Sequence, residues 1–271
     1  MLITDNINIC DVIKIAKMAG EVILEVYNSD FSIEYKKDDS PLTLADKKAN
    51  DIIVKSLKAL YPDIPILSEE SKHIPYEARR QWKYLWLVDP LDGTKEFIKR
   101  NGEFTVNIAL IEKDTPILGV IYAPVKQLLY FAFKEDGAFM VDNAADVINC
   151  GHSNELKAKS CKLPLNNNTE KFTIVASRSH MSKETENYIE GLKQEYGEVN
   201  IVSAGSSLKF CLVAEGKADV YPRFAPTMEW DTAAGHIVVE EAGGKVREVK
   251  TNSPLKYNKE DLLNPLFIVK G

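Results

Sequence analysis

The side chains best suited to chemistry in this sequence are carboxylates, and they stand at three separated places. Glu69 follows a short apolar run, Asp89 and Asp92 follow a longer one, and Asp231 lies near the start of a late apolar segment. Carboxylate oxygens are the ligands that Mg²⁺ and Mn²⁺ prefer in proteins. If these three places converge in space, they form a site for a divalent cation.

The strongest of these signals is the segment from Asp89 to Thr94, which directly follows an apolar strand. We expect Pro90 and Gly93 to force a tight turn that aims Asp89 and Asp92 at one point, with the Leu91 carbonyl as a third hard oxygen. The backbone N–H groups of Gly93 and Thr94 would open a short helix and offer donors to phosphate oxygens. The alternative is an exposed turn, because Asp, Pro and Gly favour turns for conformational reasons alone. The two other acidic places make that alternative weaker.

The elements that must position these residues follow from hydrophobic periodicity. Helical spacing predicts helices over residues 6–27 and 44–60, and alternating or apolar runs predict strands over 64–67 and 84–88. Four further strands should form an antiparallel meander over residues 104–112, 117–123, 128–133 and 138–141. A polar loop is expected from 145 to 169, followed by a strand at 172–176 and helices near 182–196, 206–216 and 230–242. We therefore expect an N-terminal α+β lobe over 1–144 and a C-terminal α/β lobe over 145–271.

Composition limits the possible partners. The chain has 271 residues, 45% of them apolar, and a formal charge of −6, which argues against a surface that coats a nucleic-acid polymer. No run of eighteen apolar residues occurs, so no integral membrane segment is expected. The four cysteines include no C-x-x-C pair and are interpreted as reduced thiols of a cytoplasmic protein. Peripheral association with the inner membrane stays open, as does the choice between monomer and homodimer.

Four segments together resemble the inositol monophosphatase superfamily. They are Pro41 to Asp46, Glu69-Glu70, Asp89 to Thr94 and Trp230 to Gly235, in the superfamily's order and spacing. The similarity runs from about residue 36 to 248. Within the superfamily, the sequence looks closest to the CysQ-type 3′(2′),5′-bisphosphate nucleotidases, through Ala176 to His180, Gly205 to Phe210, Asp219 to Arg223 and Glu229 to Asp231. The resemblance implies a layered αβαβα sandwich.

The resemblance also implies a metal site and a catalytic pair. It places two or three Mg²⁺ ions, or Mn²⁺, on the side chains of Glu69, Asp89, Asp92 and Asp231 and on the carbonyl of Leu91. It makes Thr94 and Asp46 the pair that activates water, which is chemically sensible because a threonine hydroxyl can orient water toward a carboxylate base. The family's behaviour further implies sensitivity to Li⁺. The alternative is that Thr94 caps a helix and Asp46 complements the positive start of another.

Substrate choice requires a second anion site away from the metals, and Lys209, Arg223 and Arg178 are candidates. Lys209 follows Ser206 at a predicted helix start, so its ammonium group, the hydroxyl and backbone donors could hold a phosphate. The resemblance places Ser206, Lys209 and Arg223 around a nucleotide and His180 near its base or phosphate. The phosphate that is cleaved would then lie near Gly93, Thr94 and Asp231. The alternative is that the cations are surface charges and His180 an exposed loop residue.

The function implied by the resemblance is hydrolysis of the 3′-phosphate of adenosine 3′,5′-bisphosphate (PAP) to AMP and phosphate by metal-activated water. The sulfated relative 3′-phosphoadenylyl sulfate (PAPS), which would give APS, is a further expected substrate, and both compounds belong to sulfur assimilation. An inositol monophosphatase or a fructose-1,6-bisphosphatase-like sugar phosphatase would share the metal site with a different pocket. A non-enzymatic sensor of nucleotide or metal is the remaining alternative, although such a protein would not need Asp46 and Thr94.

Overall fold

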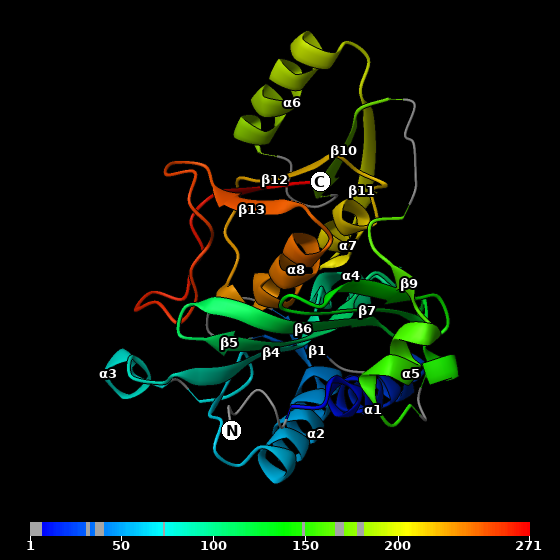
Figure 1. Cartoon of the computed structure of the whole chain (residues 1–271), viewed down its shortest axis with the longest axis vertical. Coiled ribbons are helices and arrows are strands. Elements are labelled where there is room, and N and C mark those ends of the chain that lie inside the picture. Colours follow the sequence, from blue (N-terminus) through cyan, green and yellow to red (C-terminus); the bar gives the residue numbers. More distant parts are fainter. Residues whose placement is uncertain are drawn as a thin grey trace.

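The protein folds into alternating layers of helices and sheets (Figure 1). The computed structural model describes residues 7–30, 33–35, 41–72, 74–147, 150–165, 171–177 and 182–271. Helices α1 (Ile9–Tyr27) and α2 (Leu44–Leu60) form the first layer, and helices α7 (Leu208–Ala214) and α8 (Glu229–Glu241) lie between the two large sheets. Helix α6 (Lys183–Tyr196) covers the outer face of the second sheet. The predicted αβαβα sandwich is confirmed.

The first large sheet has seven strands in the order β3-β4-β5-β6-β7-β8-β9. Strands β3 and β4 are parallel, and every other neighbouring pair is antiparallel. The meander predicted between residues 104 and 141 is therefore confirmed. The strands are β3 (Ile66–Ser68), β4 (Tyr84–Asp92), β5 (Thr105–Glu112), β6 (Thr115–Ala123), β7 (Leu128–Phe133), β8 (Gly137–Val141) and β9 (Cys161–Lys162).

Both faces of this sheet are covered, which explains its nearly continuous apolar strands. Helix α1 packs on one face and helix α8 on the other, so all but the last residue of β5 are buried. Close approach of α8 depends on Gly119 in β6, because a Cβ atom there would lie 2.6 Å from the backbone oxygen of Ala234. A larger residue at position 119 would push α8, and the carboxylate at its start, away from the sheet.

The second large sheet has five strands in the order β11-β10-β12-β14-β13. Strands β11, β10 and β12 run parallel, and β14 and β13 add antiparallel neighbours. The helices predicted near residues 182–196, 206–216 and 230–242 correspond to α6, α7 and α8. The strands are β10 (Thr173–Ser177), β11 (Asn200–Ala204), β12 (Val220–Arg223), β13 (Lys245–Glu248) and β14 (Phe267–Lys270).

The polar loop predicted from residue 145 to 169 is wrong over most of its described length. It contains the 3₁₀ helix η2 (Ala144–Val147), helix α5 (Ser153–Ala158) and strand β9. Helix α5 is short but capped, since the His152 side chain accepts a hydrogen bond from the backbone of Glu155, and its Leu156 is fully buried. Because β9 pairs with β8, the first sheet extends past residue 144 to residue 162. The division into two lobes at residue 145 stays a prediction.

The remaining short elements frame the site. Strands β1 (Ile33–Tyr35) and β2 (Pro41–Thr43) pair antiparallel, and helices α3 (Tyr76–Arg79) and α4 (Thr94–Ile98) precede and follow β4. Helix α2 begins at the predicted residue, because Thr43 accepts a hydrogen bond from the backbone of Ala45. Within the described ranges, no helix is both long and apolar enough to cross a membrane.

Candidate metal and phosphate site

Parallel pairing of β3 and β4 brings the first two acidic places together. Ser68 pairs with Val88 in this register, so Glu69, which directly follows β3, lies beside Asp89 of β4. The backbone N–H of Glu69 continues the ladder by donating to the Val88 carbonyl at 3.1 Å. The prediction of carboxylates at strand ends therefore holds for Glu69, whereas Asp89 lies within β4 and is brought beside it by the parallel pairing.

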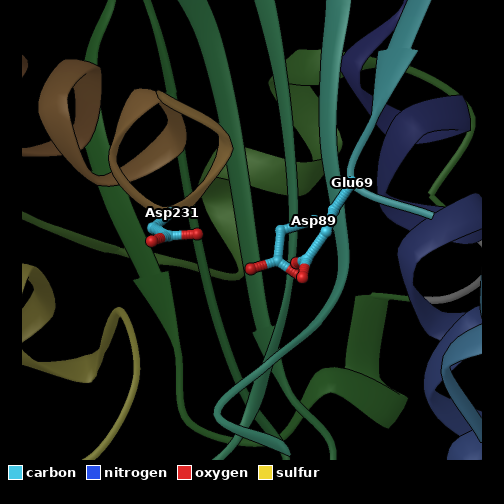
Figure 2. Close-up of side chains that lie close together, drawn as sticks. All are labelled: Glu69, Asp89 and Asp231. Atoms are coloured by element: carbon cyan, nitrogen blue, oxygen red, sulfur yellow. The ribbon is translucent and has the colours of Figure 1, made fainter. Parts of the chain in front are cut away.

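Helix α8 brings the third carboxylate to the same point. Asp231 lies in the first turn of α8, where its Oδ2 atom accepts a hydrogen bond from the Met228 backbone at 2.9 Å. One carboxylate oxygen from each of Glu69, Asp89 and Asp231 falls in a group whose atoms all lie within 4.8 Å of one another. Figure 2 shows Asp231 facing the other two side chains from the helix across the site. Three predicted ligands therefore converge.

The cluster carries like charges in a poorly hydrated place. Burial, followed by the repulsion from Glu69, raises the pKa of Asp89 well above its usual range. Burial, followed by the repulsion from Asp92, does the same to the pKa of Asp231. A cation among these oxygens would remove the repulsion and satisfy the carboxylates. The donor set consists of hard oxygens only, which fits Mg²⁺ or another hard divalent ion.

The tight turn predicted at Asp89 to Thr94 is wrong in its first part. Strand β4 continues to Asp92, and its pairing with β5 shifts by one residue between Asp89 and Asp92. This β-bulge accommodates Pro90, which has no N–H group for the ladder. The chain turns only at Gly93, whose φ of 90° lies in the left-handed region. The bulge, rather than a turn, sets the directions of Asp89 and Asp92.

Asp92 is held differently from the other carboxylates. Its Oδ2 atom accepts hydrogen bonds from the hydroxyls of Ser206 at 2.7 Å and Ser207 at 2.8 Å, and from the Asn107 amide at 3.3 Å. Asp92 lines the same cavity as Glu69 and Asp231 but is not a member of the group of three. Its role as a metal ligand stays a prediction. Sequence reasoning missed Ser207 and Asn107, although a polar Asn inside an apolar strand is a signal for a buried hydrogen bond.

Asp46, in the first turn of α2, lies next to Thr94, the first residue of α4. The Oδ2 atom of Asp46 accepts from the backbone and hydroxyl of Thr43, at 2.7 and 2.6 Å, which completes the cap of α2. Its Oδ1 atom lies 3.4 Å from the Thr94 hydroxyl, which also lies 3.4 Å from the Leu91 carbonyl. The helix-capping role of Asp46 and its contact with Thr94 therefore coexist, because they use different oxygens.

One cavity of about 220 Å³ joins the carboxylates to the predicted substrate residues. Asp89, Leu91 and Asp46 are not part of its lining, whereas Gly93, Thr94, Ser206, Lys209 and Arg223 are. Among its other lining residues, sequence reasoning missed Lys95, Glu96, Gly205, Phe210, Tyr221, Thr227 and Thr232. The cavity spans both sheets, since Thr94 follows β4 of the first and Arg223 ends β12 of the second.

Two of the cations that line this cavity, Lys209 and Arg223, donate hydrogen bonds to backbone carbonyls. The Lys209 ammonium group donates to the carbonyls of Ser206 at 2.6 Å and Ala204 at 3.4 Å, and burial lowers the pKa of Lys209 to about 8. Arg223 donates through Nη2 to the Pro226 carbonyl at 2.8 Å, whereas its buried Nε has no hydrogen-bond partner in the described part of the chain. An N–H group of this kind calls for an acceptor. Both cations can receive an anion here.

Two predicted substrate residues cannot be placed. Arg178 and His180 lie outside the described residues. Their roles stay predictions.

Comparison with known proteins agrees with this geometry. The 3′(2′),5′-bisphosphate nucleotidase CysQ of Salmonella typhimurium is 46% identical over 260 residues, which cover 95% of this chain and 97% of that protein. The nucleotidase of the same name from Haemophilus influenzae is 36% identical, with 96% and 91% covered. The crystal structure of CysQ from Bacteroides thetaiotaomicron has a TM-score of 0.87 at 52% identity and covers 96% of each chain.

More distant structures share the fold. An inositol monophosphatase from Thermotoga maritima has a TM-score of 0.72 at 23% identity, with 96% of this chain and 90% of that chain covered. The profile of the inositol monophosphatase family matches residues 6–270. That match contains both large sheets and every carboxylate of the site, and it agrees with the resemblance of the four sequence segments. The chain belongs to the inositol monophosphatase family.

Proposed function

We propose that this protein is a Mg²⁺-dependent 3′(2′),5′-bisphosphate nucleotidase that hydrolyses the 3′-phosphate of adenosine 3′,5′-bisphosphate to give AMP and phosphate. The observation that carries the proposal is the cavity that joins three clustered carboxylates to Lys209 and Arg223. The names of the relatives from Salmonella typhimurium and Bacteroides thetaiotaomicron support it. 3′-Phosphoadenylyl sulfate carries the same 3′-phosphate and is a second proposed substrate.

Glu69, Asp89 and Asp231, with Asp92 and the Leu91 carbonyl, would hold the Mg²⁺ ions. The chemistry that Mg²⁺ supplies when bound is neutralisation of phosphate charge and a lowered pKa of water. Family membership supports metal dependence in general, and the identity and number of ions belong to this proposal. The burial and mutual repulsion that raise the pKa values of Asp89 and Asp231 agree with it, since a cation among these oxygens would offset both.

Asp46 and Thr94 orient the attacking water. The Thr94 hydroxyl lies between the Asp46 carboxylate and the Leu91 carbonyl, 3.4 Å from each, so its proton can point to either acceptor. The hydroxyl oxygen can then accept a hydrogen bond from water, and Asp46 can take up a proton through it. The backbone N–H groups at Gly93 and Thr94 start a helix of only five residues and serve here as local donors to phosphate oxygens.

Ser206, Lys209 and Arg223 would bind the 5′-phosphate and ribose of the substrate. A phosphate oxygen that accepts from the Arg223 Nε would satisfy the buried donor, and the Lys209 ammonium group lies on the same wall of the cavity. A substrate with one phosphate, such as inositol 1-phosphate, would leave these cations without an anion. The presence of Lys209 and Arg223 in the cavity therefore favours a substrate with two phosphate groups.

The test is phosphate release by the purified protein with Mg²⁺ from three compounds: adenosine 3′,5′-bisphosphate, inositol 1-phosphate and fructose 1,6-bisphosphate. We expect the nucleotide to have the highest kcat/KM and Lys209→Ala to remove most of that preference. Lys245→Ala, at an exposed position of β13, is the matched control and should behave as wild type. Preference for either other substrate would overturn the proposed pocket, and no release from any compound would overturn the phosphatase function.

A further inference from the structure

A second cavity, which we call the basic groove, lies away from the phosphatase site. It measures about 540 Å³ and is lined by residues from the segments 76–83, 113–114 and 256–259. These segments are the α3 region before β4, the turn between β5 and β6, and the loop between β13 and β14. None of its lining residues belongs to the carboxylate cavity. The volume lies in the range of small-molecule sites.

The charge of the basic groove is opposite to that of the whole chain. Five cations line it, namely Arg80, Lys83, Lys113, Lys256 and Lys259, and the only carboxylate in its lining is Asp114. The chain as a whole has a formal charge of −6. A local excess of positive charge on an acidic protein attracts anions to that place in preference to the rest of the surface.

Only part of this positive charge is neutralised within the protein. Lys256 pairs with Asp114 at 3.1 Å, and Lys259 pairs with the buried Glu229 at 2.5 Å. Arg80, Lys83 and Lys113 are exposed and form no ion pair with any described carboxylate. Three cations of one cavity thus remain available to a ligand. Their mutual repulsion would be relieved by an anion with several charges.

The framework of the basic groove is fixed by buried hydrogen bonds. Arg79 is buried and donates to the Asn258 side chain at 2.9 Å, while the Asn258 amide donates back to the Arg79 carbonyl at 2.9 Å. Glu229 accepts from the backbone of Asn258 and Lys259, at 2.5 and 3.0 Å. The segments on two sides of the groove are therefore linked before any ligand binds, which lowers the entropic cost of binding.

Aromatic side chains stand beside the cations. Tyr76 and Trp82 line the basic groove and are half-buried, and the buried Tyr257 lies in the same lining. The guanidinium of Arg79 lies 5.2 Å from the Tyr76 ring centroid, so one part of that ring is already occupied. Trp82 packs partly against the hydrophobic core between the sheets, and the remainder of its side chain lines the groove, where a planar ring could stack. Stacking of a base on an aromatic side chain contributes about 1–3 kcal/mol.

We propose that the basic groove is a second ligand site, which binds a nucleotide carrying a chain of phosphate groups. The three cations without ion pairs would bind the phosphates, and Trp82 would contact the base. The site is distinct from the carboxylate cavity, with which it shares no lining residue.

Isothermal titration calorimetry of the full chain in metal-free buffer tests this proposal. Without metal, the carboxylates of the phosphatase site weaken its affinity for polyphosphates, and a parallel titration of Lys209→Ala combined with Arg223→Ala removes the cations of that cavity, so the binding of adenosine 5′-triphosphate that remains belongs to the basic groove. The probes are this nucleotide, inorganic tripolyphosphate, which lacks the base, and adenosine, which lacks the charge. We expect one saturable site for the nucleotide, weaker binding of tripolyphosphate by about tenfold and still weaker binding of adenosine.

The decisive variant is Lys83→Glu combined with Lys113→Glu. Its control is Lys183→Glu combined with Lys193→Glu, which makes the same change in net charge at exposed positions of α6. Nucleotide affinity should fall at least about tenfold in the groove variant and change less than about twofold in the control. Phosphatase activity with Mg²⁺ should be kept in both, which also shows that both fold. No saturable binding, or equal weakening in the two variants, would overturn the proposal.

Discussion

The phosphatase cavity has an acidic wall and a basic wall, which differ in how their charges are compensated. On one wall stand Glu69 and Asp231, whose carboxylate oxygens lie within 4.8 Å of an oxygen of Asp89 behind the lining, and the pKa values of both aspartates are raised. On the other, Lys209 and Arg223 are held by backbone carbonyls. The charges of the acidic wall would be compensated by a bound cation, whereas the cations of the basic wall are already oriented by hydrogen bonds within the protein. The proposed chemistry thus depends on metal binding, and substrate recognition depends on oriented donors.

The largest expected effect is on the acidic wall. Asp89→Asn should lower kcat by a factor on the order of a thousand or more, because it removes a charged oxygen from the proposed metal site. It should keep the fold, since it also removes a buried charge from a cluster of like charges. Steady-state phosphate release and thermal unfolding measure the two quantities. Asp63→Asn, at an exposed position, is the control. Near-normal turnover of Asp89→Asn would contradict the proposed site.

The basic wall should affect selectivity more than chemistry. Arg223→Ala should lower kcat/KM for adenosine 3′,5′-bisphosphate by about 10- to 100-fold, the equivalent of one charge-assisted hydrogen bond. Turnover of inositol 1-phosphate should change little. Arg247→Ala, which removes an arginine from β13 of the same sheet, should change neither. Equal losses on both substrates would mean that Arg223 acts on the structure of the site rather than on recognition.

A smaller effect concerns pH. Burial lowers the pKa of Lys209 to about 8, so its ammonium group is lost as pH rises through that value. The KM for adenosine 3′,5′-bisphosphate should therefore rise between about pH 7 and 9, by at most about tenfold. Lys209→Met should show a higher KM without this rise. The measurement is a set of initial rates across that range. A rise that persists in Lys209→Met would assign the ionisation to another group.

A separate effect, on stability rather than on rate, concerns the metal-free protein. A carboxyl whose pKa is raised on folding destabilises the native state once pH exceeds its unfolded value of about 4, and increasingly so up to its folded value. The free energy of unfolding should therefore fall as pH rises above about 4, by about 1 kcal/mol per pH step of one for each carboxyl that stays protonated in the native state, until pH reaches the raised pKa of the carboxyl. Denaturant titrations of wild type and Asp89→Asn measure this slope, which should be shallower in the variant. Equal slopes would mean that Asp89 is not the source.

Much of this molecule could be predicted from local patterns. The spacing of Ala45, Ala49, Ile53 and Leu57 predicts α2, and all four residues are buried. The carboxylates that follow two apolar runs predict the cluster, because the parallel register of β3 and β4 sets Glu69 beside Asp89. The αβαβα arrangement, however, is implied only by resemblance to a family, since periodicity alone does not say which sheet a strand joins.

What could not be predicted depends on contacts between distant segments. The turn expected at Pro90 is a β-bulge, because pairing with β5 continues past the proline. The serine hydroxyls that bind Asp92 come from far along the chain, with separations of 114 and 115 residues. The basic groove likewise combines three segments that are far apart in the sequence. Tertiary pairing decides such features.

The hydrogen bonds from Ser206 and Ser207 to Asp92 have an evolutionary consequence. They tie the start of α7, the helix that carries Lys209, to β4, the strand that carries Asp89, so the recognition wall cannot move without disturbing the acidic wall. New substrate preferences should arise first by replacement at Arg223, the last residue of β12, whose side chain donates to the Pro226 carbonyl only three residues away. Replacement at Ser206 would change specificity and catalysis together. New specificity should therefore evolve more easily at Arg223 than at the hydrogen bonds between Asp92 and the two serines.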